Sequence, residues 1–265
     1  MPHAVITGAS SGIGAALARE YAAAGFAVTL VARRRALLEA LASELPVKTR
    51  VVEADLGDPA QAQRWLPACT TELGPVDVLI NNAGVQIVAP TVEISVAEGR
   101  RLLEVDLQAP LALVQAVLPA MLARRSGAIV NIASLAALAP TPGMTWYNAA
   151  KGGLAAASES LRGELRKSGV HVLTVYPGPV HTPMGDYGYA AYPPTLSVRL
   201  LPVGTTAQLA QRVRRAVASR AARVIYPRPY ALARLFPGLT RFLLDRSTPP
   251  PYALDAPERQ RAQRS

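Results

Sequence analysis

The chain has 265 residues, half of them apolar, which is enough for one large α/β domain with a sizeable core. Its single cysteine, Cys69, excludes an internal disulfide, and its three histidines show no metal-ligand spacing, so no metal site is expected. The net charge of +10 arises in residues 199–265, where 13 arginines stand against three acids. Such a segment suits an acidic partner or an anionic membrane; no aromatic-interleaved basic motif accompanies it, so nucleic-acid binding is not expected.

The N-terminus enters an apolar, strand-like run at once, without the basic region and cleavage site of a signal peptide. The longest apolar stretch, residues 109–122, is broken by Pro110, Gln115 and Pro119. It is too short and interrupted for a membrane span and predicts a buried helix. We therefore expect a soluble cytoplasmic protein.

Apolar, β-rich runs alternate with helical patterns along the chain. The expected strands are residues 3–8, 27–33, 48–55, 76–84, 127–134, 170–178 and 223–227. Helical patterns occupy residues 14–25, 35–45 and 149–169. Near-continuous apolar strands alternating with helices predict an α/β fold with a doubly wound parallel sheet of about seven strands and helices on both faces.

The last third of the sequence changes in character. Residues 179–204 are rich in Pro, Gly and Tyr and are long for a simple connection, which is typical of a substrate loop. We expect one domain over residues 1–226, including this loop. Residues 227–265 are expected to be an extension that packs on the domain and ends in a frayed basic tail.

The first strand runs into the sequence TGASSGIG, residues 7–14. Glycine at the junction of strand and helix allows a tight turn, lets backbone N–H groups approach a pyrophosphate, and places a helix N-terminus beside it. The context of strand, turn and helix predicts a dinucleotide site. Its expected residues are Gly8, Ser10, Ser11, Gly12, Ile13 and Gly14.

The second strand ends at Arg33 and Arg34, with no acid beside them. In NAD-binding βαβ units an acid at this point binds the ribose 2′-hydroxyl, whereas an arginine can bind a 2′-phosphate. The pair therefore predicts NADP(H) as cofactor. A solvated arginine cluster at the start of a helix is the alternative.

Six motifs together resemble the short-chain dehydrogenases/reductases over residues 3–226. They are TGASSGIG (7–14), ADL (54–56), NNAG (81–84), Ser134, YNAAK (147–151) and PGPVHT (177–182). The resemblance implies a Rossmann-like oxidoreductase that is usually a dimer or tetramer, with helices around residues 100–123 and 149–167 at the interface. It implies further cofactor contacts from Asp55 and Leu56 at the adenine, from Asn82, Ala83 and Gly84, and from Pro177, Gly178, Val180 and Thr182 at the nicotinamide.

Tyr147 and Lys151 are four residues apart on an expected helix, so their side chains share one face. A free tyrosine has a pKa of about 10, and a neighbouring cation lowers it. Tyr147 is then the expected acid and base, and Ser134 hydrogen-bonds the substrate oxygen. Lys151 also holds the nicotinamide ribose, so Tyr147 and Lys151 belong to the cofactor site too. The alternative is that Tyr147 packs and Lys151 extends to solvent.

Asp106 departs from the family pattern, in which most relatives have asparagine. The resemblance implies that this residue holds a water linked to the lysine, largely through its backbone carbonyl. An ionised Asp106 near Lys151 would also change the pH profile. A structural aspartate that bonds a helix hydroxyl or a water is equally compatible with the sequence.

The substrate must be inferred from the variable segments, since one fold supports many reactions. The substrate loop offers Met184, Tyr187, Tyr189, Tyr192, Leu196 and Leu200, which suit an apolar or aromatic carbonyl compound but are also ordinary packing residues. Residues 230–246 interleave apolar side chains with arginines. This segment could cover the pocket, form an oligomer contact or lie on an anionic membrane.

Three hypotheses follow. The first is an NADP(H)-dependent carbonyl reductase or dehydrogenase for a lipophilic ketone, aldehyde or secondary alcohol. The second is a 3-oxoacyl reductase, acting on acyl carrier protein or coenzyme A thioesters, whose basic C-terminal region docks an acidic carrier. The third is a non-catalytic NADP(H)-binding regulator, against which Ser134, Tyr147 and Lys151 argue.

Overall fold

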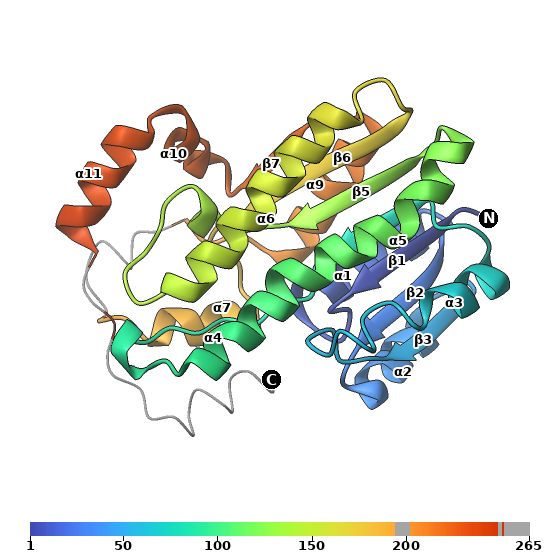
Figure 1. Ribbon diagram of the computed structural model, residues 1–265, viewed down its shortest axis with the longest axis horizontal. Coiled ribbons are helices and arrows are strands. Elements are labelled where there is room, and N and C mark those ends of the chain that lie inside the picture. The colour runs from blue at the N-terminus through green and yellow to red at the C-terminus, as the bar shows by residue number, and fades with distance from the viewer. Residues whose placement is uncertain (194–201, 249–250, 252–265) are drawn as a thin grey trace.

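The computed structural model describes residues 1–193, 202–248 and 251. Within them, a seven-stranded parallel sheet has the strand order β3-β2-β1-β4-β5-β6-β7, with helices on both faces (Figure 1). The strands are β1 His3–Thr7, β2 Ala27–Ala32, β3 Thr49–Glu53, β4 Val78–Asn81, β5 Gly127–Ile132, β6 Val170–Pro177 and β7 Arg223–Tyr226. The doubly wound parallel sheet predicted from the sequence is confirmed. Its order reverses between β1 and β4, where such sheets bind ligands.

Helices cover each face of the sheet because successive strand side chains alternate between the faces. In β1, Ala4 and Ile6 belong to the core cluster under α1, α2 and α9, whereas Val5 belongs to the cluster under α3 and α5. The helices are α1 Gly12–Ala23, α2 Arg35–Glu44, α3 Leu66–Leu73, α4 Val96–Leu103, α5 Ala109–Arg124, α6 Thr145–Glu164, α7 Pro183–Ala190, α9 Thr206–Ala218, α10 Ala231–Leu235 and α11 Pro237–Ser247. Shorter helical turns are η1 Thr91–Glu93, η2 Glu104–Gln108, η3 Leu135–Ala137 and η4 Arg228–Tyr230.

Helices α4 and α5 join through η2, a π-helical turn, into one helical stretch from Val96 to Arg124. The helix predicted over residues 109–122 is confirmed as α5, and neither proline of this apolar run breaks it. Pro110 lies in the first turn of α5, where a missing N–H is tolerated, and Pro119 is accommodated within the helix. By length and composition alone this stretch could cross a membrane, but the α5 side chains facing the sheet are part of the core.

A buried polar chain connects the centre of the sheet to α6. The Asn81 side-chain amide in β4 donates to Asn131 Oδ1 in β5 at 2.8 Å, and the Asn131 amide donates to Ser158 Oγ in α6 at 2.7 Å. Directional hydrogen bonds between buried groups favour one arrangement of the three elements. This arrangement sets α6, which carries Tyr147 and Lys151, against the ends of the central strands.

The C-terminal helices α10 and α11 lie beyond the carboxyl ends of the strands, on the same side as α7 (Figure 1). The segment from η4 to α11 makes two hydrogen bonds to the rest of the fold, from Tyr230 Oη in η4 to the Pro202 carbonyl at 3.3 Å and from Arg241 in α11 to the Pro140 carbonyl at 3.1 Å. Leu196, Leu200 and the predicted basic tail over 255–265 lie outside the described residues. The boundary at residue 226 stays a prediction.

Candidate active site

A cavity of about 470 Å³ lies at the carboxyl ends of the strands. Its wall includes nearly all the residues that the sequence analysis selected. These are Gly8, Ser10, Ser11, Gly12, Ile13, Arg33, Arg34, Asp55, Leu56, Asn82, Ala83, Gly84, Ser134, Tyr147, Lys151, Pro177, Gly178, Val180, Thr182, Met184 and Tyr187. Two selected residues, Gly14 and Asp106, do not line the cavity and lie behind its wall.

The glycine-rich turn forms a tight cradle at one part of this wall. Gly8 has a φ of +66°, and a Cβ there would lie 2.8 Å from the Ala83 Cα. A Cβ on Gly14 would lie 2.1 Å from the Gly8 carbonyl oxygen, so the helix can approach the strand only with glycine there. Helix α1 begins at Gly12, and Ser11 makes no side-chain cap to its first turn. The turn therefore fits a pyrophosphate, which the N–H groups of the first turn can bind.

Arg34 lies across the glycine-rich turn. Its guanidinium group donates to Ser10 Oγ at 3.0 Å and to Ser11 Oγ at 2.8 Å. Burial, with a smaller contribution from Arg33, lowers the pKa of Arg34, but its side chain keeps a full positive charge at neutral pH. The residue that ends β2, Ala32, is uncharged. The first two residues after β2, Arg33 and Arg34, are therefore both positively charged and both line the cavity.

The Asp55 carboxylate has hydrogen-bond partners that were not among the expected cofactor-binding residues. Its carboxylate accepts from Arg101 in α4 and from the Gly57 backbone N–H. Partial burial is the largest influence and by itself would raise the pKa of Asp55. The hydrogen bonds from Arg101 and Gly57, together with the charges of Arg101 and Arg33, outweigh it, so the pKa lies below its usual value. Arg101 was not among the residues selected from the sequence, because 46 residues separate it from Asp55.

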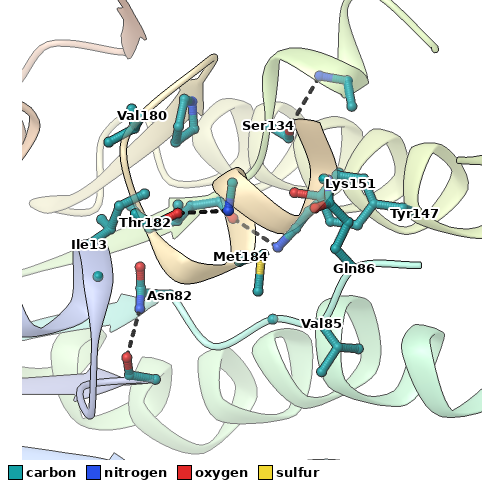
Figure 2. Close-up of a pocket in the computed structure, with 18 of the residues that line it drawn as sticks. Ile13, Asn82, Val85, Gln86, Ser134, Tyr147, Lys151, Val180, Thr182 and Met184 are labelled. Carbon is teal, nitrogen blue, oxygen red and sulfur yellow. Dashed lines mark hydrogen bonds between the residues drawn. The ribbon is translucent and has the colours of Figure 1, made fainter. Parts of the chain in front are cut away.

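The loop after β4 is clamped to the end of β1. The Asn82 side-chain amide donates to the Thr7 carbonyl at 2.9 Å, and the Thr7 hydroxyl accepts the backbone N–H groups of Asn82 and Ala83 at 2.9 and 3.0 Å. These bonds bring the glycine-rich turn and the NNAG segment together across the switch point of the sheet. Figure 2 shows Asn82 facing Ile13 on this side of the cavity.

Ser134, Tyr147 and Lys151 come together on the other side of the cavity, from the end of β5 and from α6 (Figure 2). The Lys151 Nζ lies 5.9 Å from the centre of the Tyr147 ring and donates to the Ile132 carbonyl at 3.2 Å. Lys151 is 4% exposed, which contradicts the alternative in which it extends to solvent. The Ser134 Oγ accepts the Ala136 N–H at 3.1 Å, which orients the hydroxyl at the cavity wall.

Asp106 is fully buried behind Lys151. Its Oδ2 lies 3.1 Å from the Lys151 Nζ, and its Oδ1 accepts the Val85 backbone N–H at 2.7 Å. The π-helical turn η2 carries Asp106, and π-turns widen a helix locally. A Cβ on Gly84 would lie 2.9 Å from the Asp106 Oδ2, so the glycine leaves room for the pair. The Asp106 side chain thus contacts Lys151 directly, and its other partner is a backbone N–H rather than a helix hydroxyl.

The charges of the three residues are coupled. Burial is the largest influence on Tyr147 and raises its pKa. The charge of Lys151 and a hydrogen bond with Ser134 lower this pKa, whereas the charge of Asp106 raises it further. The cation effect predicted from the sequence is present, but the predicted fall in pKa does not result, because loss of solvent around the phenol outweighs it. Burial alone would lower the pKa of Lys151, but Asp106 and Tyr147 together raise it, so the ammonium form is retained.

The remaining cavity wall is mainly apolar and aromatic. Met184 and Tyr187 come from α7, and the Tyr192 hydroxyl donates to the Pro142 carbonyl at 2.6 Å, which leaves its ring to line the cavity. The wall also contains residues that were not selected from the sequence, among them Gln86, Met144, Tyr230, Leu244 and Thr248. Only the amphipathic pattern of residues 230–246 hinted at pocket cover, and it did not indicate which side chains face inward.

Comparison with known proteins agrees with this arrangement. The family model described as short chain dehydrogenase matches residues 2–191. An uncharacterized oxidoreductase of Staphylococcus epidermidis is 35% identical over 183 residues, which cover 69% of this chain and 80% of the relative. The chain therefore belongs to the short-chain dehydrogenase family, whose members use a nicotinamide cofactor.

Three similar proteins of known structure have titles that name a cofactor or a substrate class. A short-chain dehydrogenase of Sphingobium yanoikuyae in complex with NADPH is 30% identical, with a TM-score of 0.78 over 96% of this chain and 99% of that one. A bulky-bulky ketone specific alcohol dehydrogenase of Comamonas testosteroni is 29% identical, with a TM-score of 0.75 over 90% and 93%. A 3-ketoacyl-(acyl-carrier-protein) reductase of Brucella melitensis complexed with NADH is 25% identical, with a TM-score of 0.75 over 85% and 96%.

Proposed function

We propose that the protein is an NADP(H)-dependent oxidoreductase that interconverts a lipophilic ketone or aldehyde and the corresponding alcohol. The observation that carries this proposal is the position of Ser134, Tyr147 and Lys151 in the cavity wall, with the lysine near the tyrosine ring and Asp106 paired to it behind the wall. One half of the cavity fits a dinucleotide, and the other half is apolar. A proton donor and a charged lysine stand between the two halves.

Different residues would bind the adenine end and the nicotinamide end of the cofactor. The first turn of α1 and the glycine-rich turn would hold the pyrophosphate, and Asp55 and Leu56 the adenine end. The nicotinamide end would be held by residues 82–84, by Lys151 at the ribose, and by Pro177, Gly178, Val180 and Thr182. When bound, the nicotinamide supplies or accepts the hydride.

The chain itself supplies the proton. In the reducing direction the Tyr147 phenol gives its proton to the substrate oxygen, while the Ser134 hydroxyl donates a hydrogen bond to that oxygen. The Lys151 ammonium stabilises the resulting phenolate until a proton returns. Asp106 keeps Lys151 charged and oriented, since the two groups form a buried ion pair. In the oxidising direction the same groups act in reverse.

The preference for NADP(H) rests on Arg33 and Arg34. Their positive charges follow β2 at the cavity wall, where an acid would repel a 2′-phosphate. The similar Sphingobium protein was solved with NADPH, whereas the similar Brucella protein was solved with NADH. The family thus uses both cofactors, and the two arginines are what favours NADP(H) in this chain.

A bulky apolar substrate suits the other half of the cavity. Met184, Tyr187, Tyr192, Tyr230 and Leu244 supply apolar and aromatic surface. The similarity to a bulky-bulky ketone specific alcohol dehydrogenase supports the same substrate class. The second candidate, a 3-oxoacyl reductase, is favoured by the similarity to the Brucella enzyme and by the basic C-terminal quarter of the chain.

The deciding experiment follows NADPH and NADH oxidation by absorbance across aryl ketones, medium-chain aldehydes, a steroid ketone and an acetoacetyl thioester. We expect turnover of an apolar carbonyl compound, faster with NADPH than with NADH. Turnover of the thioester alone would replace the proposal with the 3-oxoacyl reductase. Tight NADPH binding without turnover of any compound would favour a non-catalytic NADP(H)-binding regulator.

We also propose that the enzyme acts in the cytoplasm as a homodimer or homotetramer. The helical stretch from Val96 to Arg124 and α6, which the resemblance places at the interface, both reach the surface of the single chain (Figure 1). Native mass spectrometry of the full chain measures the subunit number directly. A monomer at micromolar concentration would contradict the proposed assembly.

A further inference from the structure

Helices α10 and α11 present a cluster of large apolar side chains to solvent, which we term the apolar patch. Each member is more than half exposed: Leu232, Leu235, Phe236, Leu239, Phe242 and Leu243. Soluble proteins commonly expose single leucines, but six large exposed apolar side chains on two consecutive helices indicate an interaction surface. The two helices lie together at one end of the molecule (Figure 1).

On α11 the members of the patch lie on a second face of the helix, separate from the face that packs on the fold. Thr240, Leu244 and Thr248 are partly buried at intervals of four residues, and Leu244 and Thr248 line the cavity. Leu239, Phe242 and Leu243 lie on the opposite side of the helix by the 3.6-residue period. The helix therefore uses its inner face for the cavity wall and still exposes an apolar outer face.

Arginines surround the patch. Arg228, Arg234 and Arg246 are exposed, and helical spacing places Arg246 on the same side of α11 as Phe242 and Leu243. Asp245 is the one acid in the sequence between residues 228 and 248, and it pairs with Arg241. The sequence of residues 252–265 adds three arginines against Asp255 and Glu258. The segment as a whole is therefore cationic.

This charge decides between two occupants of the patch. In a symmetric contact between two copies, the same surface meets itself, so the cationic surroundings of one patch would face the cationic surroundings of the other. An anionic bilayer instead offers lipid headgroups to the arginines and an apolar interior to Leu239, Phe242 and Leu243. We propose that the outer face of α10 and α11 binds peripherally to an anionic membrane surface.

The position of the patch also connects it to the cavity. Because Leu244 and Thr248 line the cavity from the inner face of α11, binding through the outer face would place one cavity wall next to the lipid. If the proposed function holds, a lipophilic substrate dissolved in the bilayer would then have a short path to Tyr147. Membrane binding itself does not depend on that function, so its test needs no enzyme activity.

Vesicle flotation of the full chain tests the proposal. The probes are vesicles of phosphatidylcholine alone and vesicles of phosphatidylcholine with phosphatidylglycerol. We expect binding to the anionic vesicles that weakens as salt increases, and much less binding to the neutral ones. The double variant Phe242→Ser/Leu243→Ser should bind at least about ten-fold more weakly. Its matched control is Val92→Ser/Val96→Ser, which removes two exposed apolar side chains elsewhere and should bind normally.

A second pair of variants isolates the charge. Arg234→Gln/Arg246→Gln should weaken binding by about twenty- to thirty-fold, since each arginine near an anionic surface contributes roughly five-fold. Arg64→Gln/Arg166→Gln removes two exposed arginines elsewhere and should have little effect. All the substituted side chains are exposed, so we expect unchanged thermal unfolding, and a variant that unfolds early is replaced by the corresponding alanine variant.

Three results would overturn the proposal. One is equal recovery of the protein with neutral and anionic vesicles, and another is wild-type binding by Phe242→Ser/Leu243→Ser. The third is an absence of vesicle binding together with self-association, measured by sedimentation, that the same double variant abolishes. That last result would assign the patch to a contact between copies of the chain.

Discussion

The Asp106 carboxylate and the Lys151 ammonium form a buried ion pair, with Oδ2 and Nζ 3.1 Å apart. Asp106 is fully buried and Lys151 is 4% exposed, so solvent hardly screens their interaction. The carboxylate raises the pKa of both Lys151 and Tyr147. A single carboxylate behind the cavity wall therefore sets the charge of the lysine and biases the tyrosine toward its protonated form.

Replacing this carboxylate with an amide should shift the pH dependence of the reaction. Asp106→Asn keeps an oxygen for the Val85 N–H and should remain active. It removes the negative charge that raises the pKa of Tyr147, so the phenolate needed for alcohol oxidation should form at lower pH. The measurement is the pH–rate profile of oxidation, whose midpoint should move down. Asp58→Asn, at a partly exposed position outside the cavity wall, is the control; an unmoved midpoint in Asp106→Asn would show that the carboxylate has no influence on the reacting group.

Removing the phenolic hydroxyl should abolish most turnover while sparing cofactor binding. Tyr147→Phe keeps the ring that packs between α6 and the cavity, and it loses only the group that carries the proton. We expect kcat to fall by about a hundred- to ten-thousand-fold and the NADPH dissociation constant to stay within a few-fold. Steady-state kinetics and fluorescence titration measure the two effects. Turnover near that of the wild type would exclude Tyr147 as the acid and base.

Arg33 should discriminate between the two nicotinamide cofactors. Arg33→Ala removes a positive charge at the end of β2 and should weaken NADPH binding by roughly ten- to a hundred-fold, with little change for NADH. The matched control is Arg35→Ala, because Arg35 is exposed and pairs with Glu39 on the surface of α2. Competition titrations with both cofactors give the four affinities. Equal losses for NADPH and NADH in Arg33→Ala would mean that Arg33 does not contact the 2′-phosphate.

Adjacent leucines on opposite faces of α11 should differ in their effect on substrate use. Leu244 lines the cavity, whereas Leu243 is 53% exposed on the outer face. Leu244→Ala removes apolar contact area and should raise KM for the bulkiest accepted ketone by roughly ten-fold. Leu243→Ala should leave KM unchanged. Identical KM values in the two variants would remove α11 from the substrate site.

His171 should make the fold less stable in acid. It is 7% exposed in β6, and burial, with a smaller effect of Arg220, lowers its pKa to about 4. The unfolded chain binds a proton at about pH 6.5, so the fold favours the neutral ring. Stability is therefore complete above that pH and decreases as pH falls toward 4.

The size of this loss can be measured against His171→Gln, which cannot take up the proton. Between about pH 7 and about pH 4.5 the free energy of unfolding of the wild type should fall by about 2 kcal/mol more than that of the variant. Urea denaturation at both pH values gives the four free energies. Parallel losses in the two proteins would mean that His171 already titrates normally in the folded state.

The order of motifs along the chain was sufficient to predict the sheet and most of the cavity wall. Strands buried on both faces are apolar throughout, and Gly8, Gly12 and Gly14 stand where a turn must approach a ligand closely. The four-residue spacing of Tyr147 and Lys151 places both on one helix face in any helical structure. These signals are local or depend on backbone geometry, so they can be detected without knowing which segments meet.

Contacts between distant segments required the tertiary structure. Arg101 in α4 meets Asp55 although 46 residues separate them, and Tyr230 and Leu244 line the cavity although both come from the C-terminal part of the chain. The pKa of Tyr147 also differs from the simple expectation, because burial depends on everything packed around the ring.

The sequence by itself therefore determined the family, the glycine-rich turn and the set of polar residues that line the cavity, since short-range spacing and residue type encode them. The tertiary structure alone decided that Asp106 pairs with Lys151 and that one face of α11 lines the cavity while the other is exposed. Both depend on which surfaces long-range packing removes from water. Local sequence patterns do not specify that packing.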